Sequence, residues 1–337
     1  MRRQSTRRTM LLSAGGGLVA GVTAGVTGGH AAPGPTPIKV SSFGGLSNLP
    51  IFAAEDIGSF AKYGLAVEVS FTPNSQSQRD NLAKGEFQII HTAADNAVAM
   101  VELAKTDAVV VAGGDNGFNR IFVQPEVASL ADLRGKTLVV DAPNTAFALL
   151  LYKALKDAGL NKGDYAVHSV GGTPQRLKAM LTDKANAAAG IINPPLSFEA
   201  AAAGLKDMGS ATKAVGDYQS GSVVVMRSWA KANGDLLVRY LKAIIEGRRW
   251  LLDAANKDAA IRLLMDRLKL SRDFAAKSYA VVTDPVDGFA KDGAFNMQGF
   301  KNVLALRAEI EGEWGGRPPA PDKYIDLSYY KAAIAGL

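Results

Sequence analysis

Residues 86–105, EFQIIHTAADNAVAMVELAK, predict a short apolar strand, a polar turn and then a helix. The helix has apolar side chains at three- and four-residue spacing, at positions 97, 98, 101 and 104. The turn holds three polar side chains, Thr92, Asp95 and Asn96. Open α/β sheets bind ligands where a strand ends at a helix N-terminus, so this turn is a candidate binding site. The simpler interpretation is that Thr92 or Asp95 only caps the helix.

The first 32 residues have the features of an export signal. Four arginines (Arg2, Arg3, Arg7 and Arg8) precede a glycine-interrupted apolar run, and His30-Ala31-Ala32 offers a small-residue cleavage site. The sequence Thr6-Arg7-Arg8-Thr9-Met10-Leu11 matches the twin-arginine pattern. A membrane anchor is the alternative, but the run is shorter than the ~20 strongly apolar residues that a span needs. We therefore expect export to the bacterial periplasm in a folded state.

The charge and the cysteine content narrow the class of protein further. The chain carries a net charge of +6, and four of these charges are the arginines of residues 1–32, which leaves +2 for the rest. No basic block is interleaved with aromatic residues, so we expect no nucleic-acid partner. The chain has no cysteine and hence no disulfide framework, and its length is ample for two lobes with separate cores.

Strands and helices alternate after residue 37, which predicts an α/β fold with mostly parallel sheets. We expect strands at 38–42, 65–71, 108–112, 137–140, 168–170, 187–192 and 223–226. Several of them end in short polar turns like that of residues 92–96, and the further candidates are Ser42, Asn48, Asp115, Asn116, Asn144, Thr145, Thr173 and Asn193. Together these turns predict a cleft between two lobes, lined by hydroxyls, amides and helix N-termini.

The sequence offers little support for an enzyme or a metal site. It has no His-Glu-x-x-His, no phosphate-binding loop with its lysine, and no Gly-x-Ser-x-Gly elbow in the exported part. His91 and His168 stand apart from any paired carboxylate, so we expect neither zinc nor another cofactor. His91 is interpreted as a hydrogen-bonded core residue. A Ser–His–Asp arrangement assembled from distant loops stays open.

Three segments resemble the nitrate/sulfonate/taurine-type substrate-binding proteins of ABC importers, a group that also includes binders of thiamine-pyrimidine precursors. Residues 48–68, NLPIFAAEDIGSFAKYGLAVE, are similar to the Leu-Pro-aromatic helix, the Gly-x-Phe turn and the Gly-Leu-x-Val-Glu strand of the first lobe. Residues 129–140, SLADLRGKTLVV, resemble the start of the second lobe, and residues 177–195 resemble the segment that ends in an Asp/Asn-Pro turn. The resemblance covers nearly all of residues 38–285.

The resemblance implies a two-lobe periplasmic binding protein fold of type II and a set of ligand-facing turns. Those turns correspond to Ser42, Asn48, Thr92, Asp95, Asn96, Asn144, Thr145 and Asn193, whereas Asp115, Asn116 and Thr173 come from the strand-end argument alone. Asp95 and Asp115 would place carboxylates on the wall, with Arg120 the only nearby cation in the sequence. Because carboxylates repel anions, we expect a neutral or amine-bearing heterocyclic or aromatic ligand rather than a sulfonate.

The sequence therefore predicts a monomeric solute-binding receptor, not an enzyme, that delivers a small organic ligand to an ABC permease in the inner membrane. The first lobe is expected to comprise residues 33–117 and 220–337, and the second residues 118–219, with a hinge near Gly117 and Ser220. Ligand would bridge the lobes and stabilise the closed form. An enzyme or a periplasmic sensor built on the same fold is the alternative.

Overall fold

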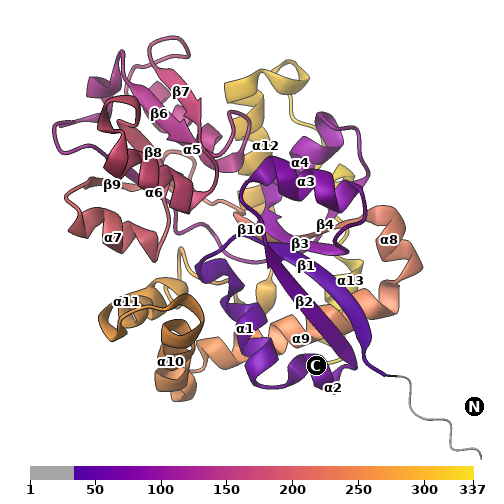
Figure 1. Cartoon of the computed structure of the whole chain (residues 1–337). Helices are drawn as coiled ribbons and strands as arrows, with labels where there is room; N and C mark the ends of the chain where they lie inside the picture. The colour runs from indigo at the N-terminus through magenta and orange to yellow at the C-terminus, as the bar shows by residue number, and fades with distance from the viewer. Residues whose placement is uncertain (1–33) are drawn as a thin grey trace, which may run out of the picture. The chain divides into compact units, whose positions relative to one another are not determined.

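Two five-stranded sheets organise residues 34–337, the part of the chain that this computed structural model describes (Figure 1). The first sheet contains β1 (Thr36–Ser42), β2 (Leu65–Phe71), β3 (Ile89–Ala93), β4 (Ala108–Gly113) and β10 (Gly221–Met226). The second contains β5 (Arg120–Val123), β6 (Thr137–Val140), β7 (Ala166–Ser169), β8 (Ala189–Ile192) and β9 (Lys206–Ser210). The predicted export signal, residues 1–32, lies outside the described residues.

The two sheets share one strand pattern. Their orders are β2-β1-β3-β10-β4 and β7-β6-β8-β5-β9. In the first sheet β1 is parallel to β2 and β3, while β10 is antiparallel to both of its neighbours, β3 and β4. In the second, β6 is parallel to β7 and β8, while β5 is antiparallel to β8 and β9. Four strands of each sheet therefore run in the same direction, in agreement with the predicted, mostly parallel sheets. The exceptions are β10 and β5, each of which follows a crossing of the chain from one sheet to the other.

Helices cover both faces of each sheet because successive strand residues point to opposite faces. The helices near the first sheet are α1 (Leu49–Asp56), α2 (Ser59–Lys62), α3 (Ser75–Ala83), α4 (Ala94–Glu102), α8 (Arg227–Ala232), α9 (Gly234–Leu252) and α13 (Ser328–Ala335). Apolar residues of α1, α9 and α13 pack with Ile38 and Val40 of β1, and those of α3 and α4 pack with Ile90 and Val110 on the other face.

The second sheet is enclosed in the same way. Its helices are α5 (Ala146–Asp157), α6 (Thr173–Thr182) and α7 (Leu196–Ala202), and α12 (Met297–Glu311) packs on α5. A further core forms where α10 (Lys257–Leu268) and α11 (Arg272–Val282) pack with α1. No helix among residues 34–337 combines the length and the apolar character that crossing a bilayer requires.

Most predicted strands are present with small shifts at their ends. The predictions at 65–71 and 137–140 are confirmed as β2 and β6. Strands β5 and β9, which are adjacent at one edge of the second sheet, were not predicted from the sequence. Strand β9 begins with the exposed residues Lys206 and Asp207, so its sequence lacks the apolar pattern that predicts a buried strand.

The polar turn predicted within residues 86–105 is absent. Strand β3 extends through Thr92 and passes directly into α4, whose N-cap residue is Ala93, without a side-chain hydrogen bond. Neither Thr92 nor Asp95 caps the helix, so the interpretation of these residues as caps is wrong. The strand reaches further than its apolar residues because β10 pairs with it, as in the register Ser222–Thr92.

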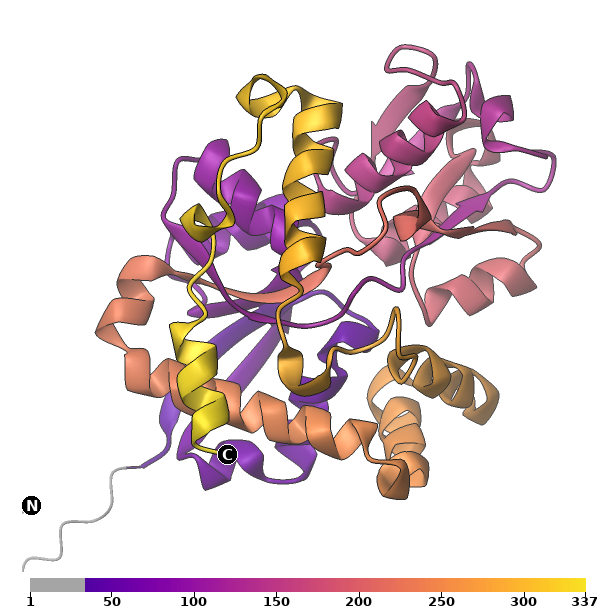
Figure 2. The same cartoon turned by 180° about the vertical axis from the view of Figure 1, so that it is seen from behind.

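Two crossing segments connect the sheets and lie side by side (Figure 2). The first runs from β4 to β5 and the second from β9 to β10. The Ser220 N–H donates to the Asp115 carbonyl at 3.2 Å, and a Cβ atom on Gly114 would lie 2.8 Å from the backbone of Gly221. Such a close approach of two backbones excludes any side chain at Gly114.

Candidate ligand-binding site

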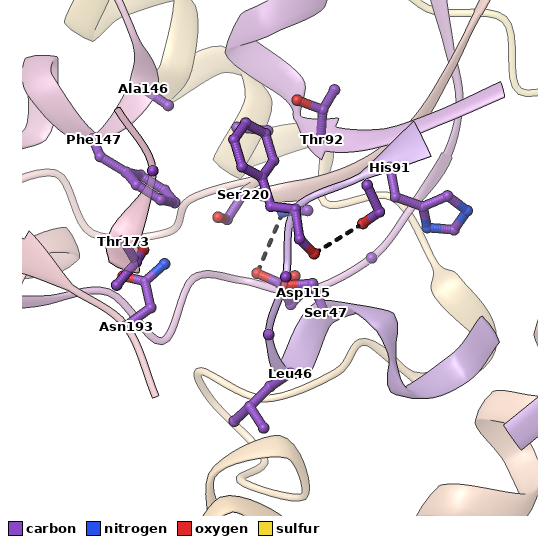
Figure 3. A pocket seen from close by; sticks show the side chains of 18 of the residues that line it. Leu46, Ser47, His91, Thr92, Asp115, Ala146, Phe147, Thr173, Asn193 and Ser220 are labelled. Atoms are coloured by element: carbon purple, nitrogen blue, oxygen red, sulfur yellow. Dashed lines mark hydrogen bonds between the residues drawn. The ribbon is translucent and has the colours of Figure 1, made fainter. Parts of the chain in front are cut away.

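A cavity of about 420 Å³ lies at the strand ends and is lined by residues from both sheets (Figure 3). This volume is within the range of ~300–1,000 Å³ that small-molecule sites occupy. Seven of the residues predicted from the sequence line the cavity, namely Ser42, Thr92, Asn96, Asp115, Thr145, Thr173 and Asn193. Hydroxyl and amide groups dominate this set, as expected of a site that orients a ligand through neutral hydrogen bonds.

The first sheet contributes a row of hydroxyl groups. Ser42 ends β1, Thr92 lies in β3, and Ser222 lies opposite Thr92 in β10. Thr92 Oγ1 accepts a hydrogen bond from Asn96 Nδ2 at 2.6 Å. Ser42 Oγ has only a long contact of 3.4 Å with the Phe43 carbonyl, and Ser222 Oγ has no partner among the described residues. Ser222 is not among the site residues predicted from the sequence.

The second sheet contributes side chains from the starts of two helices and from the end of β8. Thr145 Oγ1 donates to the Ala142 carbonyl at 2.9 Å, just before α5. Thr173, the first residue of α6, accepts from Arg176 Nη2 at 2.9 Å. Asn193 follows β8, and its Oδ1 is buried without a hydrogen-bond partner in the described chain. Asn193, Thr173 and Phe147 lie on one side of the pocket, with Thr92 and His91 on the other (Figure 3).

Arg176 is a buried cation of the cavity wall that the sequence analysis missed. Its Nε donates to the Ile191 carbonyl and its Nη1 to the Gly171 carbonyl, each at 2.9 Å. Phe147 lies 5.8 Å from its guanidinium carbon. Burial lowers the pKa of Arg176 to about 10, and the charge of Asp141 opposes that shift. Arg176 stays charged at neutral pH and binds only neutral oxygens.

Arg248 is the second buried cation, on α9. Its Nη1 donates to the Gly114 carbonyl at 2.6 Å, and its guanidinium carbon lies 4.9 Å from the Phe289 ring. Burial lowers the pKa of Arg248 to about 10, with the charge of Asp115 acting in the opposite sense. Its Nε has no acceptor within the described residues. Arg248 therefore brings a positive charge to a wall that the sequence predicted to be acidic.

Asp115 lines the cavity and also ties the two crossing segments together. Its Oδ1 accepts from the Gly117 N–H at 3.1 Å and from the Gly221 N–H at 3.3 Å. Burial raises the pKa of Asp115, and the positive charge of Arg248 opposes the shift. A Cβ on Gly221 would lie 2.1 Å from Asp115 Oδ2, so this contact requires glycine. The carboxylate is thus satisfied by backbone donors.

Asp141 links the two sheets across the cavity. It follows β6, and its oxygens lie 3.1 and 3.3 Å from the Ser75 N–H at the start of α3. The first N–H groups of a helix attract a carboxylate because they have no partner within the helix. Nearby, the Gly172 N–H donates to the Pro73 carbonyl at 3.0 Å. The α3 terminus is therefore already occupied by a carboxylate of the protein.

Four predicted site residues, Asn48, Asp95, Asn116 and Asn144, do not line the cavity. Asn48 is buried and donates to the Gly45 carbonyl, and Asn116 donates to the Val286 carbonyl at 3.0 Å. Asn144 contributes its backbone carbonyl, which accepts from Arg307 Nη2 at 3.1 Å. The three asparagines therefore form hydrogen bonds with the backbone or side chains around the site and do not line the cavity.

Asp95 forms a buried ion pair. Arg307 Nε and Nη2 donate to its two carboxylate oxygens at 2.9 and 2.8 Å, and both side chains are almost fully buried. Arg307 also pairs with Glu313. Burial disfavours the charged form of Arg307, but the negative charges of Asp95 and Glu313 outweigh this effect and raise the pKa of Arg307 above its ordinary value. Because Arg307 neutralises its charge, Asp95 does not repel anions from the cavity as the sequence predicted. Arg120, the cation that the sequence placed near the site, pairs with Asp207 at 2.5 Å and does not line the cavity.

His91 is a neutral side chain of the wall. Its Nε2 lies 2.8 Å from the Tyr240 hydroxyl. Burial lowers the pKa of His91 to about 3, and the positive charge of Arg248 adds to the shift. The hydrogen bond to Tyr240 agrees with the interpretation of His91 as a hydrogen-bonded core residue. Among the described residues no cluster of three or more His, Cys, Asp or Glu side chains could hold a metal ion.

The sequence is similar to that of one named protein among the curated proteins compared. A protein of Brachyspira hyodysenteriae, named as an ABC transporter periplasmic binding protein, is 26% identical over 230 residues. The match spans 63% of this chain and 64% of that relative's length.

Solved structures share the fold. The periplasmic nitrate-binding protein NrtA from Synechocystis PCC 6803 has a TM-score of 0.75 at 17% identity, with 91% of this chain and 90% of that chain covered. The alkanesulfonate-binding protein SsuA from Xanthomonas axonopodis pv. citri, bound to MOPS, has a TM-score of 0.69 at 16% identity, with 83% and 94% covered. These likenesses identify the periplasmic binding protein fold that the resemblance implied.

A family model gives the assignment itself. The model described as NMT1/THI5 like matches residues 47–257, which is more than half of the chain and includes strands of both sheets. The chain belongs to the NMT1/THI5-like family.

Proposed function

We propose that this protein is the solute-binding receptor of an ABC importer. The observation that carries the proposal is the cavity of about 420 Å³ lined by both sheets, in a chain of this family whose fold is that of nitrate- and alkanesulfonate-binding proteins. The cavity has buried polar groups and aromatic side chains but no metal cluster among the described residues. A cavity of this size and lining is suited to binding a small organic solute.

In this proposal, the lobes formed by residues 33–117 with 220–337 and by residues 118–219 close on the ligand. Motion would occur at the crossing segments near Gly117 and Ser220, where Asp115 holds the two backbones together. A ligand that touches both walls stabilises the closed form by its differential affinity. A monomer in that form docks on an inner-membrane permease.

We place the protein in the periplasm and its export on the twin-arginine route, because residues 6–11 match that signal. The variant Arg7→Lys/Arg8→Lys keeps the charge and removes the arginine pair. We expect the precursor to remain in the cytoplasm, as measured by fractionation and by the absence of signal cleavage. Normal export of this variant would contradict the route and leave the receptor proposal unaffected.

A binding screen tests the receptor proposal itself. Thermal-shift measurements with sulfonates, nitrate, pyrimidines and aromatic acids should identify a solute that raises the melting temperature. The bound solute should be recovered chemically unchanged after prolonged incubation and release by denaturation. Conversion of the solute would instead establish the alternative, an enzyme on the same fold.

A further inference from the structure

Helix α12 joins the two lobes along one edge, because it contacts both α4 of the first lobe and α5 of the second. One buried apolar cluster contains side chains of all three helices. Its members include Ala94 and Val98 of α4, Leu149 and Leu150 of α5, and Phe300, Val303, Leu304 and Leu306 of α12. The four α12 side chains are each at most 2% exposed. Separation of the lobes at this α4–α12–α5 edge would expose the cluster to water, which is unfavourable.

Ion pairs strengthen the same edge. Arg307 of α12 donates to both carboxylate oxygens of Asp95 on α4, and its Nη2 also donates to the Asn144 carbonyl just before α5 at 3.1 Å. At the end of α12, Glu309 lies 3.0 Å from Lys156 of α5. A buried carboxylate and guanidinium separate only at a high cost, since each loses its partner. The α4–α12–α5 edge therefore resists opening.

The start of α12 adjoins the second crossing segment. Asn302 Nδ2 donates to the Asp217 carbonyl at 2.8 Å. A Cβ on Gly299 would lie 2.6 Å from the Gln219 nitrogen, so the helix touches the backbone of the segment. Bending of the crossing segments would thus occur beside an edge that stays closed.

Helices α7 and α11 meet at a different edge. Phe198 of α7 and Phe274 of α11 have ring centres 5.7 Å apart and ring planes inclined by 46°. Both side chains are half-buried. Figures 1 and 2 both place α7 beside α11 and away from α12. An aromatic pair contributes little compared with a buried core and a buried ion pair, so this edge separates more readily.

The cavity reaches the surface between walls that belong to both lobes. Its exposed lining residues are Gly44, Ser47, Phe71, Pro174 and Gln175. The first three follow or end strands of the first sheet, and the last two lie in α6. Leu196 of α7 and Leu268, the last residue of α10, also line the cavity. Separation of α7 from α11 therefore moves the walls of the cavity apart.

We propose that the lobes rotate about the α4–α12–α5 edge, and that Phe198 and Phe274 form an aromatic clasp that holds the entrance closed while the cavity is empty. Solute enters when this contact and the hydrogen bond from the Gly172 N–H to the Pro73 carbonyl break. This inference rests on the two-lobe motion of the proposed receptor. It adds which edge opens and which side chains oppose the opening.

Pairs of spin labels measure the two edges separately. The chain has no cysteine, so introduced thiols are the only labelling sites. Ala202→Cys on α7 with Ala276→Cys on α11 forms the clasp pair of labels, and Leu103→Cys after α4 with Asp157→Cys at the end of α5 forms the edge pair. All four positions are exposed. Pulsed dipolar spectroscopy gives the distance distribution of each pair without added solute.

Phe198→Ala should lengthen and broaden the distances of the clasp pair and leave those of the edge pair unchanged. Phe274→Ala and the double variant should give the same shift, because all three remove one and the same contact. Leu181→Ala is the matched control, since Leu181 is an exposed apolar residue of α6 in the second lobe. It should change neither pair.

A covalent lock provides a second readout. Phe198→Cys/Phe274→Cys lacks the aromatic clasp, and a short bismaleimide can join its two thiols. Small-angle X-ray scattering should show a larger radius of gyration before the thiols are joined than afterwards. An equal radius before and after joining would contradict the clasp.

Unchanged distances of the clasp pair in Phe198→Ala and Phe274→Ala would overturn this inference, as would equal lengthening of both label pairs. Solute binding in the wider screen together with either result would leave the receptor function standing. Conversion of the solute would remove the receptor function, while a shift confined to the clasp pair would still support the clasp, because the labels are measured without solute.

Discussion

At the scale of single residues, a buried arginine within an apolar helical stripe is the signal that the sequence analysis overlooked. Arg248 follows Leu241 and Ile244 and precedes Leu251 on the buried face of α9. Arg307 takes the same place after Phe300 and Val303 in α12. A charged side chain at such a position must find partners inside the protein. Arg307 finds Asp95, whereas Arg248 faces the cavity.

The Asp95→Ala variant separates a structural from a ligand-binding role for Asp95. The change leaves buried Arg307 with Glu313 as its one remaining carboxylate partner among the described residues, so we expect stability to fall by ~3–5 kcal/mol. Equilibrium unfolding in urea measures the loss. The variant Asp95→Leu/Arg307→Met should recover much of it, because apolar replacement of both partners is often close to neutral. Unchanged stability with lost ligand affinity would restore the role predicted from the sequence.

His91 predicts a dependence of stability on pH. Its pKa is about 3 in the folded protein and ~6.5 when unfolded, so the unfolded chain binds the extra proton between these values. Neutral His91 makes its full contribution to the free energy of unfolding above pH 6.5. This contribution declines as the pH falls towards 3, by up to ~1.4 kcal/mol per pH unit. His91→Gln, compared with wild type in urea at pH 7 and pH 5, should show a shallower decline. Identical pH profiles would contradict the buried neutral state.

At the scale of elements, close contact between helices explains features that sequence periodicity does not contain. Helix α9 spans Gly234–Leu252 and buries one face, which includes Leu237, Leu241 and Leu251. Its contact with α1 depends on one glycine. A Cβ on Gly247 would lie 2.4 Å from the Pro50 carbonyl oxygen and 2.6 Å from the Ala54 nitrogen. The two helix backbones touch only because Gly247 has no side chain.

Gly247→Ala should therefore destabilise the protein even though alanine favours helices by ~1 kcal/mol over glycine. We expect a net loss of ~2–3 kcal/mol from forcing α9 away from α1. Gly234→Ala in the same helix is the control, because its Cβ would meet only Tyr329 at 3.4 Å. Thermal unfolding should place Gly234→Ala near wild type. A stabilising effect at Gly247 would show that the helices separate without cost.

At the scale of the whole molecule, contacts distant in sequence hold the two sheets around the cavity. Helix α12, which the sequence division assigns to the first lobe, packs on α5 beside the second sheet, and its Glu309 lies 3.0 Å from Lys156. Figure 2 shows α12 extending from the first sheet towards the second. Asp141 and Ser75 form a further link. The division into two moving lobes stays a proposal.

Asp141→Ala tests whether the link to α3 favours the closed form. Loss of the carboxylate leaves the Ser75 N–H unpaired, which should open the apo protein and weaken ligand binding about tenfold or less. Small-angle X-ray scattering should show a larger radius of gyration without ligand. Asp141→Asn keeps an acceptor oxygen and should lie between the two. An unchanged radius and affinity for Asp141→Ala would assign the contact to local stability only.

The sequence by itself determined the alternation of strands and helices and most of the turns that reach the cavity. These features follow from short-range periodicity and turn chemistry, and seven of the eleven predicted site residues line the cavity. Only the tertiary structure decided which charges face it. Asp95 and Arg307 are 212 positions apart, and no local pattern joins them. Because Asp95 pairs with Arg307, it does not line the cavity, whereas the arginines Arg176 and Arg248 do. A buried charge needs a partner inside the protein, and only the tertiary structure determines which group lies close enough to be that partner.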